Sequence, residues 1–159
     1  MFKLCVFVCV VIIMIYQYIF YILSKTKYKN TRYVYIMLPI ITTIEDRNRF
    51  VEILQTNPGA VVIKFGATWC GPCKIIEDQV HTLMNMMPNN VQSIIVDVDE
   101  CVDLYSFLKS KKMVNGIPVI LVYYKGNLNY IPDDRVVGAD KNQINTLFNK
   151  VVDRVTGKK

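Results

Sequence analysis

Two cysteines, Cys70 and Cys73, lie two residues apart in the segment Trp69 to Lys74, directly after the apolar run Val61 to Phe65. Two thiols at this spacing can cycle between a dithiol and a disulfide. A helix that begins near Cys70 would favour the thiolate of that residue through its free N–H groups and its dipole. Cys70 is therefore the expected nucleophile, and Cys73, about one turn later, the resolving thiol.

The two residues between the cysteines suit this role. Gly71 lets the backbone pass close to a partner chain, and Pro72 fits the first helical turn, where a missing N–H group costs little. The pair is therefore expected to be held at disulfide distance.

A zinc site is the main structural alternative for a C-x-x-C pair. Structural zinc takes four ligands, usually from two such pairs or from one pair and two histidines. The remaining candidates are Cys101, His81, and Cys5 with Cys9 in the apolar N-terminal segment. These candidates do not form a second pair that suits a metal, so we expect no metal site. We interpret Cys5, Cys9 and Cys101 as structural thiols. His81 is also unsuited as a catalytic partner, because roughly 16 Å of helix separates it from Cys70.

The rest of the chain indicates an α/β domain with a mixed central sheet between helices. Apolar periodicity and turn signals predict strands over 33–41, 60–65, 91–98, 119–124 and within about 130–137, and helices over 44–54, 70–87, 102–111 and 141–155.

At the cysteine motif the chain resembles the thioredoxin family. The resemblance lies in the segment Phe65 to Lys74, in Val96 to Glu100 as central strand and exit, in Gly116-Ile117-Pro118, and in Val137-Gly138-Ala139. These motifs follow the family's order at nearly its spacing and cover about Ile36 to Val155. The resemblance implies the thioredoxin fold and dithiol oxidoreductase activity.

Further expectations follow from this resemblance. Pro118 corresponds to the family's cis-proline, and Trp69, Ile117, Pro118 and Gly138 would frame a shallow groove that binds clients through main-chain hydrogen bonds. The Gly-Pro pair implies a reductase of protein disulfides. No cofactor is expected in the chain, which lacks a dinucleotide-binding fingerprint, so the electron donor would be a separate reductase or glutathione.

Lys64 departs from the family pattern. Most thioredoxins carry a buried aspartate at this position, six residues before the nucleophile, which handles the proton of the second cysteine. A buried lysine should shift toward the neutral amine or seek an anion. One hypothesis is that it stabilises the reduced form and makes the disulfide more oxidising. The alternative is that its amine reaches solvent and has little effect.

The N-terminus is a separate apolar segment. Residues 4–23 form an apolar run that is broken only by Gln17. Twenty residues in a helix span a hydrocarbon core of roughly 30 Å. We therefore predict a single-pass transmembrane anchor over 1–24, a basic linker over 25–34 and the thioredoxin domain over 35–159. A cleaved signal peptide is the alternative, but no small-residue cleavage site follows.

The net charge of +6 belongs mainly to this membrane flank. All 13 acidic residues lie at Glu45 or later, and from Tyr33 onward 14 basic residues leave a net charge of +1. The charge therefore gives no support for nucleic-acid binding. Because four cations follow the apolar segment, the domain is expected on the cytosolic side. Two other functions stay open: an oxidant or isomerase outside the cytosol, and a redox-inert interaction module.

Overall fold

The computed structural model describes residues 37–158. The elements in chain order are α2 (Arg47–Gln55), β1 (Ala60–Gly66), α3 (Gly71–Ile75), α4 (Glu77–Asn85), β2 (Val91–Asp97), α5 (Val102–Ser110), β3 (Val119–Tyr124), β4 (Asp134–Val137) and α6 (Lys141–Thr156). The expected anchor over residues 4–23 and the linker lie outside the described residues. Within 37–158, no helix combines the length and apolar character needed to cross a membrane.

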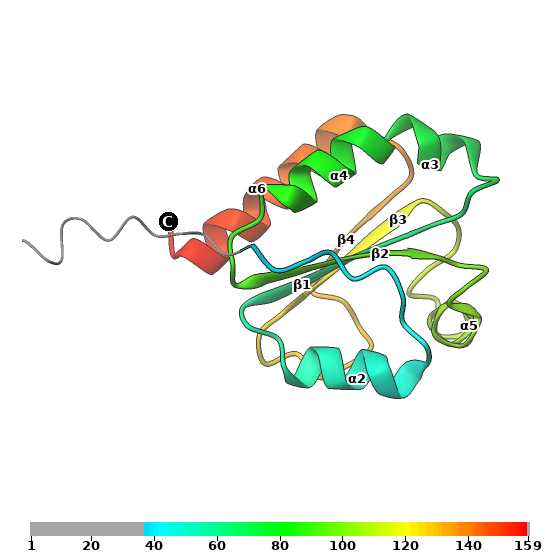
Figure 1. Ribbon diagram of the computed structural model, residues 1–159, viewed down its shortest axis with the longest axis horizontal. Helices are drawn as coiled ribbons and strands as arrows, with labels where there is room; N and C mark the ends of the chain where they lie inside the picture. The colour runs from blue at the N-terminus through cyan, green and yellow to red at the C-terminus, as the bar shows by residue number, and fades with distance from the viewer. Residues whose placement is uncertain (1–36, 159) are drawn as a thin grey trace, which may run out of the picture. The chain divides into compact units, whose positions relative to one another are not determined.

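The four strands form one mixed sheet in the order β2-β1-β3-β4. β1 is parallel to β2 and antiparallel to β3, and β3 is antiparallel to β4. Every residue of β1 and β3 is buried, as expected for two central strands covered on both faces. Figure 1 shows the two covering layers, with α3, α4 and α6 on one face and α2 and α5 on the other. The predicted α/β thioredoxin architecture is confirmed.

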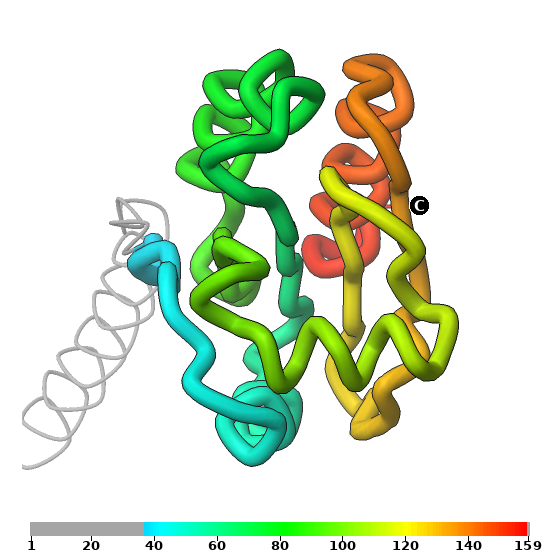
Figure 2. Tube along the Cα trace, turned by 90° about the vertical axis from the view of Figure 1, so that its right-hand side faces the viewer, coloured from blue at the N-terminus to red at the C-terminus, as the bar shows by residue number. Residues whose placement is uncertain are grey.

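Each face of the sheet has its own hydrophobic core. Alternate residues of β1 point to opposite faces, so that Val61, Ile63 and Phe65 join the core under α2 and α5, while Ala60 and Val62 join the core under α4 and α6. Figures 1 and 2 both show α4 and α6 side by side. The side chain of Gln79 on α4 links them through a 2.9 Å hydrogen bond to the backbone carbonyl of Lys141.

The predicted first strand is wrong over its described part. Residues 37–41 pair with the backbone of the sheet at one parallel bridge, between Ile41 and Ile94. Pro39 has no N–H group to donate to a ladder, and its carbonyl accepts a hydrogen bond from the Gln92 side chain instead.

The single helix predicted over 70–87 is also wrong, because it divides into α3 and α4. At Ile76 the backbone turns to φ −106° and ψ 0°, and its N–H group bonds to the Cys73 carbonyl three residues back rather than four. The Ile76 side chain is fully buried in the core under α4 and α6. The break at Ile76 therefore separates the short α3, which is capped by Cys70 and contains Cys73, from the longer α4.

Candidate functional site

The cysteine pair lies where β1 gives way to α3, at the carboxyl end of a central strand. Cys70 and Cys73 form a disulfide, with their Cα atoms 5.3 Å apart. Cys70 is the N-cap of α3, and its sulfur accepts a 3.2 Å hydrogen bond from the backbone N–H of Cys73. Pro72 lies in the first turn of α3, as predicted. The predicted redox pair is thus brought together at a helix start.

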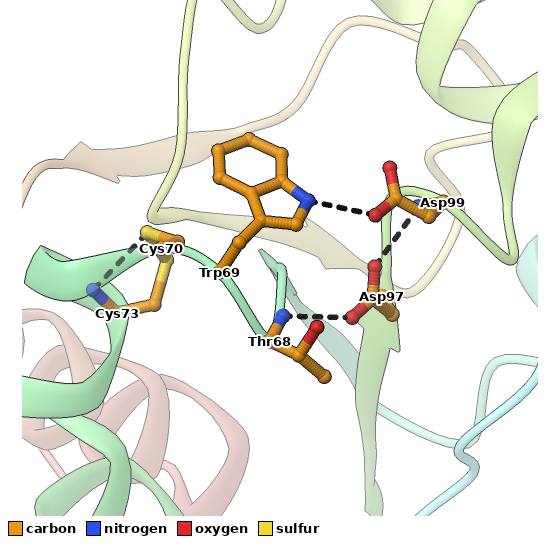
Figure 3. Close-up of a disulfide and its surroundings, with 6 residues drawn as sticks. All are labelled: Thr68, Trp69, Cys70, Cys73, Asp97 and Asp99. Carbon is orange, nitrogen blue, oxygen red and sulfur yellow. Dashed lines mark hydrogen bonds between the residues drawn. A yellow bond between two sulfur atoms is a disulfide. The ribbon is translucent and has the colours of Figure 1, made fainter.

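The loop before Cys70 is held by two carboxylates from the end of β2. Asp97 accepts a 3.0 Å hydrogen bond from the backbone N–H of Thr68, and Asp99 accepts a 2.7 Å bond from the indole N–H of Trp69 (Figure 3). A second Asp97 oxygen accepts the backbone N–H of Asp99 at 2.9 Å. Asp97 and Asp99 therefore fix the approach to the disulfide.

Sequence reasoning missed the roles of Asp97 and Asp99, although a signal was present. β1 and β2 are parallel and pair from Ala60 with Val91 to Gly66 with Asp97. Their carboxyl ends therefore lie at the same edge of the sheet, and an acidic run directly after β2 falls beside the loop after β1.

Solvent can reach the front of the site. Both sulfur-bearing residues are nearly buried, but the Trp69 side chain is 66% exposed. A side chain added at Gly71 would meet no atom within 4 Å. An incoming chain can therefore approach the cysteines over Gly71 and Trp69.

The register places Ile117, Pro118 and Gly138 at the same end of the sheet as the disulfide. Val119 pairs with Phe65 on one side and with Val137 on the other, so the residues next to Val119 and Val137 lie at that end. The Ile117–Pro118 peptide bond is cis. Gly138 adopts φ +90° and donates its N–H to the Pro118 carbonyl at 2.8 Å. Ile117 packs against the core cluster that contains both cysteines.

Lys64 lies behind the disulfide. It is in the middle of β1, between Ile95 of β2 and Ile120 of β3, and is only 6% exposed. Burial lowers the pKa of its ammonium, and this effect outweighs the charges of Glu77 and Asp97, which act to raise that pKa. The predicted burial of this lysine is confirmed, and its effect on the redox couple stays a prediction.

The other predicted thiol and imidazole lie on elements outside the cysteine motif. Cys101 is a buried free thiol directly before α5. His81 is exposed on α4, where its ring is hydrogen-bonded to Asn85. Among residues 37–158, no cluster of three or more His, Cys, Asp or Glu side chains could hold a metal ion.

Comparison with known proteins agrees with the site geometry. The family model described as Thioredoxin matches residues 41–150. The thioredoxins of Oryctolagus cuniculus and Homo sapiens are each 33% identical over 114 residues, which is 71% of this chain and 100% of each relative.

Solved thioredoxin structures have the same fold. The thioredoxin of Trichomonas vaginalis matches with a TM-score of 0.58 and 27% identity, over 70% of this chain and 96% of its own. That of Malassezia sympodialis matches with a TM-score of 0.56 and 27% identity, over 72% and 96%. The family match, the relatives covered over their whole length and the closely spaced cysteine pair lead to one conclusion: the chain belongs to the thioredoxin family and is a thiol-disulfide oxidoreductase.

Proposed function

We propose that this protein is a membrane-tethered reductase of protein disulfides. In the reaction, the Cys70 thiolate attacks one sulfur of a client disulfide, and the other client sulfur leaves as a thiolate. Cys73 then attacks Cys70 in the mixed disulfide, which forms the Cys70–Cys73 bond and releases the second client thiolate. Two electrons pass to the client, whose thiolates take protons from water. The observation that carries this proposal is the disulfide at the start of α3, on a thioredoxin fold.

The assignment of Cys70 as the nucleophile rests on its surroundings. Its sulfur is the one that accepts a backbone N–H at the start of α3, an interaction that favours a thiolate. It also adjoins the open space over Gly71. Cys73 is similarly buried but lies within α3, one turn further along the chain, and fits the second, intramolecular step.

Clients would bind across the end of the sheet. Trp69, Ile117, Pro118 and Gly138 all belong to this region, and the exposed indole of Trp69 offers an apolar contact. An extended client segment recognised mainly through its main chain would be selected by accessibility of its disulfide rather than by sequence.

The disulfide must be reduced again after each turnover. We propose that a separate reductase or glutathione supplies the electrons, because the chain has no dinucleotide-binding motif of its own. We also propose that residues 4–23 anchor the protein in a membrane with the domain on the cytosolic side. The length and apolar composition of that segment and the four cations after it support this proposal.

Reduction of insulin disulfides by dithiothreitol tests the activity. The full-length protein should accelerate the reaction, whereas Cys70→Ser and Cys73→Ser should abolish the acceleration. A redox-inert interaction module would give no acceleration with the wild-type protein.

The reduction potential separates a reductase from an oxidant or isomerase. A value near roughly −270 mV indicates a reductase, whereas a value above about −200 mV indicates an oxidant or isomerase and favours an oxidising compartment. Fusing a reporter to the carboxyl end then tests the side of the membrane.

A further inference from the structure

Lys64 is the one buried charged side chain within residues 37–158, where the other buried polar side chains are Asn57 and Ser93. Burying an ammonium group is costly unless the group is paired or gives up its proton. Within the described part of the chain, Lys64 has no hydrogen bond or ion pair in the oxidised state. An amine buried at this position, beside a redox site, is placed to respond to a negative charge that forms there when the disulfide is reduced.

The sulfur of Cys73 faces the same space as the Lys64 amine and can become an anion when the disulfide is reduced. A side-chain carbon added at Gly66 would lie 3.5 Å from the Lys64 Nζ atom and 3.6 Å from the Cys73 Sγ atom. The amine and the sulfur therefore face the same small space, which stays open because residue 66 is a glycine. Both groups line a cavity of about 140 Å³ that reaches Glu77 and Asp97.

Several charged groups face this cavity from different elements. α3 contributes Lys74, α4 contributes Glu77 and β2 contributes Asp97. The two carboxylates raise the pKa of Lys64, but burial has the larger effect and lowers it. No β3 residue lines this cavity, and the β3 residue paired with Lys64 is the apolar Ile120. Lys64 is thus an amine that can exchange its proton more readily than a surface lysine.

We propose that Lys64 accepts the proton of the Cys73 thiol and holds the resulting thiolate as an ion pair while the mixed disulfide is resolved. This inference rests on the proposed function. The proton passes from Cys73 Sγ to Lys64 Nζ, directly or through water in the cavity. The Cys73 thiolate then attacks Cys70, the bond between Cys70 and the client breaks, and the client leaves as a thiolate. The Lys64 ammonium afterwards loses its proton to water.

The positive charge of a protonated Lys64 fixes the direction in which it shifts the pKa of the Cys73 thiol. An ammonium that faces a thiol across a small cavity favours the thiolate and so lowers the pKa of the thiol. A carboxylate at the same position would raise it. Lys64 therefore accepts the proton of Cys73 and then, as an ammonium, stabilises the attacking thiolate.

Titration of Cys73 in the full-length reduced protein tests the proposal. With [¹³Cβ]cysteine labelling, the Cys73 signal can be followed against pH in the wild type, in Lys64→Met and in Lys74→Met. Lys64→Met should raise the pKa of Cys73 by at least about one unit. Lys74→Met should give a much smaller shift, because this ammonium is exposed and screened by water. Equal titration of Cys73 in the wild type and in Lys64→Met would overturn the proposal.

Single-turnover kinetics separate this inference from the proposed function. In Lys64→Met, formation of the mixed disulfide at Cys70 should keep its rate. Its resolution by Cys73 at pH 7 should slow about threefold, because a tenfold smaller thiolate fraction is partly offset by the greater nucleophilicity of a more basic thiolate. If the wild type forms no mixed disulfide, the proposed function fails. If both steps of Lys64→Met match the wild type, only the role of Lys64 fails.

A measurement on the wild type keeps the test independent of how the variants fold. With [¹³Cε]lysine, the pKa of Lys64 can be compared between the disulfide and dithiol forms. The proposal predicts a higher pKa in the dithiol form, because the Cys73 thiolate then supplies a neighbouring negative charge. An unchanged Lys64 pKa contradicts the ion pair.

Discussion

Cys101 should make the folded domain lose stability in alkaline solution. Cys101 is 2% exposed, and burial raises the pKa of its thiol from about 9 to about 11. A hydrogen bond to the Tyr105 backbone partly opposes this rise, and Asp103 and Glu45 add to it slightly. The folded protein therefore holds this proton more tightly than the unfolded chain. The stability that comes from the neutral thiol is complete below pH 9 and is lost as the pH rises toward 11.

The size of the effect follows from the two pKa values. Each unit of pKa difference corresponds to about 1.4 kcal/mol. Between pH 8 and pH 11 the wild-type protein should therefore lose about 2 kcal/mol of unfolding free energy through Cys101 alone. Other groups lose protons in the same range, since burial also raises the pKa of Tyr124 to about 12. A Cys101→Ala variant isolates the cysteine, because it keeps these groups.

Urea unfolding followed by circular dichroism measures this difference. Both proteins should be oxidised at Cys70 and Cys73, so that these thiols do not titrate. Cys101→Ala starts with a different stability at pH 8, and the informative quantity is how that difference changes with pH. We expect it to shift by about 2 kcal/mol in favour of the variant at pH 11. If the unfolding free energies of the wild type and of Cys101→Ala fall by the same amount between pH 8 and pH 11, the reasoning is refuted.

Three other predictions concern single contacts. Asp140→Ala removes the N-cap that accepts the Asn142 and Gln143 backbone N–H groups of α6, and should lower the unfolding free energy by about 1 kcal/mol in urea titrations; an unchanged midpoint would be inconsistent with this cap. Gly59→Ala would place a carbon 2.6 Å from the Asn90 carbonyl oxygen and should cost about 1–3 kcal/mol, so a melting temperature equal to that of the wild type would count against it. Asp99→Ala removes the acceptor of the Trp69 indole and should raise the KM for insulin about fivefold, with little change in stability. An unchanged KM would show that this contact does not position a client.

The sequence predicts the central strands and the redox pair well because local signals and tertiary packing agree there. Apart from Lys64, the runs Val61 to Phe65 and Val119 to Tyr124 are apolar and mostly β-branched or aromatic, and both lie in fully buried strands. The spacing of Cys70 and Cys73 by itself restricts their chemistry to a redox pair or half of a metal site. Lys64 is also identified by sequence, since a charge inside an apolar strand stands out.

Features decided by tertiary contacts could not be predicted in this way. The break at Ile76 depends on how its side chain packs into the core, and nothing in the local sequence marks a helix end there. The segment around Pro39 has β-branched residues, yet it joins the sheet at a single bridge. The hydrogen bond between Trp69 and Asp99 joins residues 30 positions apart. Each of these features depends on partners distant in the sequence.

Trapping of the mixed disulfide tests the central claim most directly. A Cys73→Ser variant of the full-length protein, incubated with oxidised insulin, should accumulate a covalent adduct that mass spectrometry assigns to Cys70. A Cys70→Ser variant should not accumulate an adduct at Cys73 at a comparable rate, because the nucleophile is missing. An adduct at Cys73, or none in either variant, would contradict disulfide exchange that begins at Cys70.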